Sequence, residues 1–141
     1  MTGLAMFTAA DAALEILNET EGLEEVELAG IGDPEPSRAT ESVWIYKTAA
    51  PERNFRTLGG VPALLDEMLE IQGRVVVMAS DNAKARCEEL ALIVDNALRF
   101  QATLDETVVF SHIATASASQ LSLDGRRGFE MLFTLTGKAR I

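Results

Sequence analysis

The sequence has few of the residue types that carry catalysis or hold a metal ion. Its 141 residues include one cysteine, Cys87, and one histidine, His112. A single cysteine cannot form an internal disulfide, and this pair of residues excludes the usual zinc-ligand spacings. Cys87 lies on the apolar stripe of an expected helix. His112 lies in an expected strand beside Phe110 and Ser111, and nothing nearby suggests a nucleophile or carboxylate partner within hydrogen-bond reach of it. We therefore expect no catalytic residue, no cofactor and no metal ion.

Motifs that bind nucleotides or calcium are incomplete. Gly30 and Gly32 lack the third glycine of a dinucleotide fingerprint, and Gly137-Lys138 is followed by Ala139 where a phosphate-binding loop needs serine or threonine. The acidic residues near the N-terminus lack the Asp-x-Asp-x-Asp-Gly order of a calcium loop. These gaps disfavour an enzyme and favour a protein that works by assembly.

Long apolar runs are also missing from the sequence. None approaches the roughly 20 residues that a helix needs to cross a bilayer. The first stretch, MTGLAMFTAADAALEIL, has no basic start and carries Asp11 and Glu15, so it does not predict a secretory signal. With 141 residues, of which 48% are hydrophobic, the chain is expected to fold as one domain over residues 1–141.

Basic residues are scarce and unevenly placed. Lysine and arginine number 12 against 22 aspartates and glutamates, which gives a formal net charge of −10. No basic residue precedes Arg38, whereas Arg126, Arg127, Lys138 and Arg140 lie close together in the last part of the chain. The acidic first third is either a solvated face or one half of a contact in which it meets the basic last strand of a neighbouring subunit.

Aromatic residues make up only 6% of the chain, and its one tryptophan and one tyrosine lie two residues apart, at Trp44 and Tyr46. Arg53, Phe55 and Arg56 follow them. Such a mixture can stack and clamp nucleic acid, but the net charge disfavours that function. Two interpretations remain. One is the edge of a monomer's core, and the other is an anchor for contacts with other subunits, where aromatic side chains and arginine dominate the binding energy.

Two stretches have the apolar spacing of helices. Residues 8–19 form the first, with Thr8 as the expected cap. Residues 81–100 form the second and follow Ser80 and Asp81, either of which can cap a helix. The apolar stripe of the second helix consists of Cys87, Leu90, Val94, Ala97 and Leu98. Both helices are expected to cover one face of a sheet.

Alternating or β-branched runs predict the strands. They are expected at residues 26–31, 42–47, 64–79, 106–119 and 129–141. In the second of these runs, Val43, Ile45 and Lys47 are expected on one face, and Trp44 and Tyr46 on the other.

The connections complete the predicted fold. Asp124-Gly125 is expected to close a hairpin between the last two strands. Residues 48–63 contain two prolines and show no clear period, so they are expected to form a long loop. The prediction is a two-layer α+β domain in which an antiparallel or mixed β-sheet is covered by two α-helices, with one long loop.

Three stretches between Glu67 and the C-terminus have a distinctive order of strands, helix and turn. The first is EMLEIQGRVVVMA running into DNAKARCEELALIVDNALRF, an extended strand followed by a helix rich in alanine, glutamate and leucine. The second is LRFQATLDETVVFSHIATAS, which contains a helix end, a Thr-Leu step and a strand. The third is DGRRGFEMLFTLTGKARI, a Gly-Arg turn with an alternating final strand. Together they resemble the tail terminator, or tail completion, proteins at the neck of long-tailed bacteriophages.

This resemblance implies a structural virion protein without catalysis. Proteins of the family form a hexameric ring on the head-proximal end of the tail tube, where they end tube polymerisation and present a surface to the head-side connector. The implied partners are further copies of the chain, the major tail tube protein and a connector or stopper protein, with DNA passing through the ring without specific binding. The implied location is the virion neck, after assembly in the host cytoplasm.

The expected assembly interface combines the aromatic and basic residues introduced above. We expect it to comprise Trp44, Tyr46, Arg53, Phe55, Arg56, Arg126, Arg127 and Arg140. Residues 48–60 are the first choice for contact with the tube or the connector, because long loops in compact domains are usually functional. The acidic segment NETEGLEEVE is not tied by the resemblance to any role.

Three alternative functions stay open at this point. Another neck-ring protein, either a head-tail stopper or a connector, fits the same composition, although a stopper is expected to be mainly β and the predicted helix at 81–100 disfavours it. A small-molecule-binding α+β domain would place His112 in a pocket. A regulatory protein whose acidity mimics nucleic acid would bind a basic partner and lose it at high salt.

Overall fold

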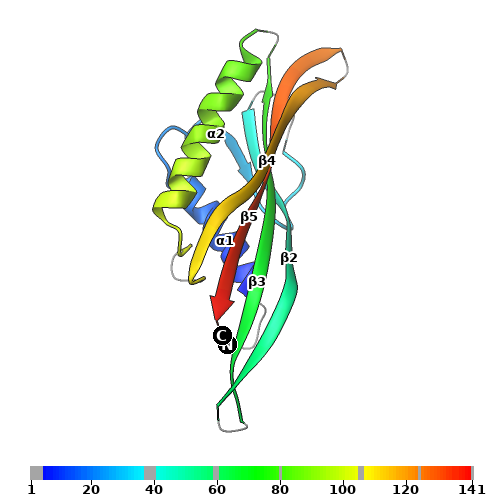
Figure 1. Ribbon diagram of the computed structural model, residues 1–141. Helices are drawn as coiled ribbons and strands as arrows, with labels where there is room; N and C mark the ends of the chain where they lie inside the picture. The colour runs from blue at the N-terminus through cyan, green and yellow to red at the C-terminus, as the bar shows by residue number, and fades with distance from the viewer. Residues whose placement is uncertain are drawn as a thin grey trace.

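The computed structural model describes the backbone of residues 5–36, 41–58, 61–79, 81–104, 107–123 and 125–140, and the side chains of these residues other than 53–58, 61–66, 123 and 140. The elements in chain order are α1 (Ala5–Asn18), β1 (Glu27–Ala29), β2 (Glu41–Leu58), β3 (Val61–Met78), α2 (Ala83–Phe100), β4 (Phe110–Leu123) and β5 (Arg126–Arg140) (Figure 1). The order of helices and strands agrees with the sequence prediction.

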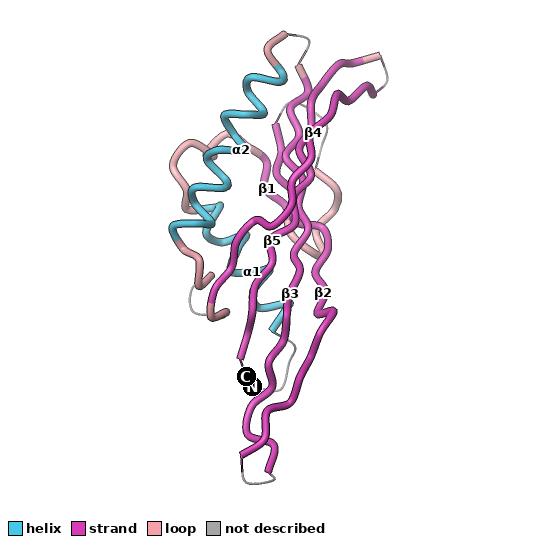
Figure 2. The backbone as a smooth tube through the Cα atoms, in the orientation of Figure 1, coloured by secondary structure: helices cyan, strands magenta, loops and turns pink. Residues whose placement is uncertain are grey.

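The strands form one five-stranded sheet with the order β1-β2-β3-β5-β4. β1 runs parallel to β2 and the other neighbouring strands are antiparallel, so the sheet is mixed. Both helices lie on the same side of the sheet (Figure 2), and we call the opposite side the outer face. The structure therefore confirms a two-layer α+β fold with a mixed sheet under two helices.

The hydrophobic core lies between the helices and the sheet. The central strands contribute alternating buried residues, which are Val43, Ile45, Leu69, Ile71, Val75 and Val77. The stripe predicted on α2 is confirmed, with Cys87, Leu90, Val94 and Leu98 buried and Ala97 half-buried. α1 contributes mostly alanines, including Ala9 and Ala13, whose small side chains allow the helix to lie close to the sheet.

The predicted long loop at residues 48–63 is wrong, because the chain forms a hairpin there. β2 continues to Leu58 and pairs with β3 from Val61 onward. Pro51 falls in an irregularity of the pairing between Ala49 and Glu52, where a missing N–H is tolerated. β5 pairs with β3 only as far as Asp66. Residues 53–58 and 61–65 therefore form a two-stranded arm that extends beyond the rest of the sheet (Figure 1).

The starts of both helices differ from the prediction. α1 begins at Ala5, so Thr8 lies inside the helix and does not cap it. The N-cap of α2 is Asn82, with φ 60° and no side-chain hydrogen bond to the helix. Asparagine is one of the few residues that adopt this left-handed conformation readily, which explains the shift of the cap from Asp81. Ser80 lies outside the described residues.

A bulge in β2 corrects the predicted position of Lys47. Val43 and Ile45 point into the core as expected. The pairing then moves from Ile45 opposite Gly73 to Lys47 opposite Gln72, so Tyr46 is the extra residue of a bulge. Beyond the bulge the two faces of β2 are exchanged, and Lys47 is exposed instead of sharing the core face with Ile45.

The hairpin predicted from Asp124-Gly125 is confirmed by the pairing around it. Leu123 lies opposite Arg126, which leaves two residues for the turn. Gly125 has φ +77°, in the left-handed region that such a turn requires. Asp124 itself lies outside the described residues.

An ion pair fastens the start of α2 to the sheet. Arg86 donates through Nε to Glu41 Oε2 at 2.6 Å and through Nη2 to Glu41 Oε1 at 3.0 Å. This two-point contact raises the pKa of Arg86 above its ordinary value, with hydrogen bonding to Glu41 as the main cause. It joins segments 45 residues apart in the sequence.

Cys87 should make stability depend on alkaline pH. Its side chain is 2% exposed, and burial raises the pKa of its thiol from 9.0 to about 11, with smaller contributions from Glu88 and Glu130. Because the folded-state pKa exceeds the unfolded value, the protonated thiol contributes stability that is complete below about pH 9 and is lost as the pH rises through 11. That loss is about 2 kcal/mol at pH 11.

Urea unfolding of the wild type and of Cys87→Ala at pH 8 and at pH 11 tests this expectation. The substitution removes the thiol. The fall in the free energy of unfolding between pH 8 and pH 11 should therefore be about 2 kcal/mol smaller in the variant than in the wild type. The other titrating groups are common to both chains and cancel in the comparison. Parallel pH dependences of the two chains would contradict the expectation.

Candidate assembly surfaces

Trp44 and Tyr46 meet on the outer face of the sheet, as predicted. Their ring centroids are 5.4 Å apart and the rings are tilted by 51°. The Arg74 guanidinium carbon lies 5.2 Å from the Trp44 ring centroid, and Arg74 Nη2 donates to Glu35 Oε1 at 3.1 Å. The Tyr46 hydroxyl lies 3.5 Å from Gln72 Oε1. The predicted pair therefore belongs to a larger cluster of aromatic and charged side chains.

The two aromatic rings are half-buried, so they pack within the chain and still present an edge to the outside. Arg74 and Glu35, whose side chains are 26% and 41% exposed, were missed by the sequence reasoning. Glu35 comes from a segment with no clear period. Arg74 falls within the predicted strand 64–79, but only the pairing of β2 with β3 places it opposite Trp44.

The other predicted residues of β2 do not join this cluster. Arg53, Phe55 and Arg56 lie on the arm. In the strand register, Arg53 is opposite Glu67 and Phe55 is opposite Leu65. Nine residues of extended strand separate Tyr46 from Phe55, which is roughly 30 Å. Their side chains lie outside the described part of the chain, so the arm is defined by its backbone pairing alone.

The basic residues of the last strand all lie on β5, where they form two separate groups. Arg126 and Arg127 begin β5, and Arg140 ends it beside the arm, opposite Asp66. Thirteen residues of strand put roughly 40 Å between the two groups. Arg126 and Arg127 instead lie at the tip of the β4–β5 hairpin, beside a cavity of about 520 Å³ that Met78, Ala79, Asp81 and Gly125 also line.

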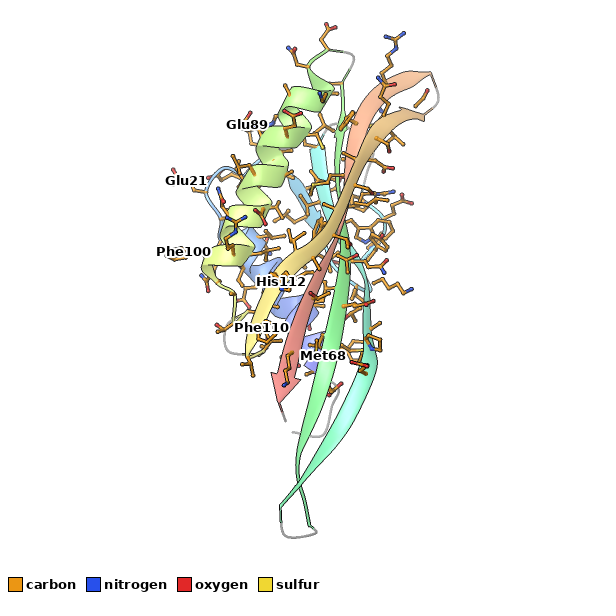
Figure 3. The ribbon with its side chains drawn as sticks, in the orientation of Figure 1. Glu21, Met68, Glu89, Phe100, Phe110 and His112 are labelled. Carbon is orange, nitrogen blue, oxygen red and sulfur yellow. The ribbon has the colours of Figure 1, made fainter. Side chains whose placement is uncertain are left out.

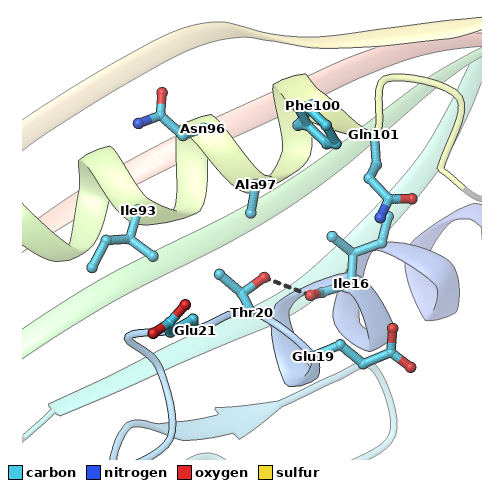
Figure 4. A pocket seen from close by; sticks show the side chains of 9 residues that line it. All are labelled: Ile16, Glu19, Thr20, Glu21, Ile93, Asn96, Ala97, Phe100 and Gln101. Atoms are coloured by element: carbon cyan, nitrogen blue, oxygen red, sulfur yellow. Dashed lines mark hydrogen bonds between the residues drawn. The ribbon is translucent and has the colours of Figure 1, made fainter.

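A cleft of about 500 Å³ lies between the end of α1 and the C-terminal half of α2 (Figure 4). Its apolar lining comes from Ile16, Ile93, Ala97 and Phe100, and the ring of Phe100 is 91% exposed. The acidic segment after α1 supplies Glu19 and Glu21, and polar side chains complete the lining at Thr20, Asn96 and Gln101. Thr20 Oγ1 donates to the Ile16 carbonyl at 2.6 Å and so holds the turn after α1 in place. Sequence reasoning noticed the acidity of this segment but not the cleft.

The edge strand β4 is a third surface with assembly character. β4 ends the strand order and pairs on one side with β5. Residues 114–120 are all exposed, and Phe110–Leu123 contains no lysine, arginine, aspartate, glutamate or proline. Edge strands of monomeric proteins usually carry such residues, because they block pairing with other chains. β2, the strand of the arm, has Pro51, Glu52 and Arg53 in this role.

The structure places the two residues that sequence reasoning considered for catalysis, His112 and Cys87, in different surroundings. His112 is exposed on β4, opposite Thr136 and near Phe110 (Figure 3). Cys87 is buried, as predicted. Within the described ranges, no group of three or more His, Cys, Asp and Glu side chains is placed to hold a metal ion. In the same ranges, no helix has the length and apolar character needed to cross a membrane.

Comparison with known proteins gives a likeness of fold. No protein-family model matches the chain, and no curated protein matches its sequence. A solved chain in the virion of a native gene transfer agent particle aligns with 99% of this chain and with 100% of its own length, at 12% identity and a TM-score of 0.59. A second solved structure aligns over 97% of this chain and 96% of its own, at 14% identity and a TM-score of 0.54. At these identities the likeness shows a shared fold.

Proposed function

We propose that this chain is a structural virion protein that forms a ring at the head-proximal end of a phage tail tube. The ring ends tube polymerisation and joins the tail to the head-side connector. The observation that carries the proposal is the fold, which is shared over nearly the full length of the chain with a component of a gene transfer agent virion. The three stretches that resemble tail terminators lie in β3, α2, β4 and β5, which form most of that fold.

The distribution of surfaces supports assembly with other copies. Large apolar side chains are exposed on several elements, with Phe7 at 51%, Leu92 at 60% and Phe110 at 46% in addition to Phe100. β4 also leaves its outer backbone edge without the usual protection. A ring of identical subunits needs two different surfaces on each copy, and this chain offers several that are far apart.

The partners follow from the same proposal. The protruding arm contacts the major tail tube protein or the head-side connector. The sequence predicts this contact for a loop at residues 48–60, and residues 53–58 of the arm fall in that range. The net charge of −10 suits a ring through which DNA passes without specific binding, because an acidic lining repels phosphate. The ring would belong to the virion neck and would assemble in the host cytoplasm.

The alternatives receive less support from the structure. The 18-residue helix α2 does not suit a mainly β stopper. The exposed position of His112 on a sheet surface does not suit a ligand pocket built around it. The proposal is tested by the mass of the purified protein in solution, together with images of the same fraction with and without tail tubes. Rings at tube ends would support it, and a chain that ignores tubes would exclude it.

A further inference from the structure

The β4–β5 tip carries an exposed arginine, Arg127. Among the arginines whose side chains the structure describes, Arg74 pairs with Glu35, Arg86 with Glu41, and Arg99 with Asp95. Arg127 is exposed and has no ion-pair partner among the described residues. Arg74, Arg86 and Arg99 are thus paired within the chain, whereas Arg127 is available to a second molecule.

The cleft between α1 and α2 has the chemistry that binds a guanidinium group. Glu19 and Glu21 contribute two carboxylates, and neither has an ion-pair partner among the described residues. The exposed ring of Phe100 offers a face for a cation, and Ile16 with Ile93 offers apolar surface for the methylene stem. Carboxylates and an aromatic face together select arginine over lysine, because the planar guanidinium both stacks and donates in pairs.

The cleft and the tip lie on opposite sides of the molecule. The cleft is on the helix side, where Phe100 and Glu21 project away from the sheet (Figure 3). The β4–β5 tip projects at the upper right of the same view, on the far side of the sheet from α2 (Figure 1). Arg127 therefore cannot reach the cleft of its own chain, and a contact between the two surfaces must join different copies.

We propose that the cleft of one copy, lined by Glu19, Glu21 and Phe100, binds Arg127 at the β4–β5 tip of a second copy. This inference rests on the proposed ring function and names one of its subunit contacts. The two surfaces differ, so the contact is heterologous and repeats from copy to copy until the ring closes. It also assigns a role to the acidic segment after α1.

Charge reversal on each side tests the contact. The mass of each chain is measured by light scattering over a range of concentrations, with and without tail tubes. Arg127→Glu and the double variant Glu19→Lys/Glu21→Lys should each raise the concentration needed for half-assembly at least tenfold, because each places like charges in contact. All three substitutions combined in one chain should restore assembly to within about threefold of the wild type, since the charges are then opposite again.

Control variants reverse a single charge elsewhere. Glu25→Lys alters an exposed residue of the same acidic segment that does not line the cleft, and Lys47→Glu alters an exposed residue of β2. Both should assemble within about twofold of the wild type. Thermal melts of every variant establish that the domain is folded, and exposed positions of this kind rarely affect folding.

The outcomes separate this contact from the proposed function. If the wild type assembles and the charge reversals assemble equally well, or if the combined chain is not restored, the contact is wrong and the ring proposal stands. If the wild type remains a monomer both with and without tubes, the ring proposal itself fails and the contact fails with it. Loss in both single-sided variants with recovery in the combined chain supports the contact.

Discussion

Shortening the arm should abolish the capping of tail tubes and leave the domain folded. In the shortened chain, residues 55–65 are replaced by Asn-Gly, which joins Asn54 to Asp66 through a two-residue turn. Asn54 and Asp66 are paired in the native hairpin, so the register of β2 with β3 is kept. The deleted part of β3 pairs only with β2, and the core described above lies outside it. We expect the free energy of unfolding to change by less than about 1 kcal/mol.

Tube capping is measured as the length of tubes grown in the presence of the protein, and the shortened chain should leave them as long as without it. A second variant, Arg53→Ala/Phe55→Ala/Arg56→Ala, keeps the arm and removes three predicted contact side chains. Loss of capping in both chains assigns the contact to these side chains, and loss in the shortened chain alone assigns it to other parts of the arm. Normal capping by the shortened chain would exclude the arm from this role.

The second large effect is expected from Gly73→Ala, in the middle of β3. Gly73 lies opposite Phe133 of β5, and a Cβ at position 73 would meet the Phe133 ring at 2.3 Å from Cζ and at less than 3 Å from two further ring atoms. Phe133 is 3% exposed, so its ring cannot swing into solvent without leaving the core. We expect the free energy of unfolding to fall by about 3 kcal/mol, as measured by urea denaturation.

A double-mutant cycle separates this clash from a general effect of alanine in a strand. Phe133→Leu shortens the side chain that covers Gly73 and lowers stability by itself, because it leaves a cavity. In Gly73→Ala/Phe133→Leu, the new methyl group occupies part of that space. The double variant should therefore be more stable than the sum of the single effects predicts, by at least about 1 kcal/mol. Additive effects would show that the ring moves freely.

The elements that sequence reasoning predicted well are those with one dominant signal. The stripe from Cys87 to Leu98 has helical spacing, and the structure buries it. Asp124-Gly125 has the composition of a tight turn between alternating runs, and the pairing of Leu123 with Arg126 confirms the hairpin. In both cases local chemistry and tertiary packing favour the same conformation, which is why the pattern suffices.

The arm was missed because its signals are mixed. Two prolines and a stretch without alternation predict a loop, because a central strand does not tolerate proline. Here Pro51 lies at an irregularity of the pairing, and Pro62 lies in the part of β3 that pairs with β2 alone. The misplaced Lys47 has a similar cause. The bulge at Tyr46 changes the face of the residues that follow it as far as Ala49, where the next irregularity begins, and no residue type in the sequence marks the bulge.

The candidate interface was predicted as a set of residue types and could not be predicted as a surface. Trp44 and Tyr46 come together because they are two residues apart on one strand. Arg127 and Arg140 are only thirteen residues apart in the sequence. Because those residues form an extended strand, the two arginines lie roughly 40 Å apart in the fold. The cleft around Phe100 depends on how α1 meets α2, which no local pattern contains.

The most direct test of the account is the location of the protein on growing tail tubes. Purified protein is added to polymerising tube protein, its mass is followed by light scattering, and the same fraction is imaged with and without tubes. The account predicts ring-shaped particles at one end of each tube, and shorter tubes as more protein is added. A protein that stays monomeric at all concentrations and leaves tube ends bare and tube lengths unchanged would contradict it.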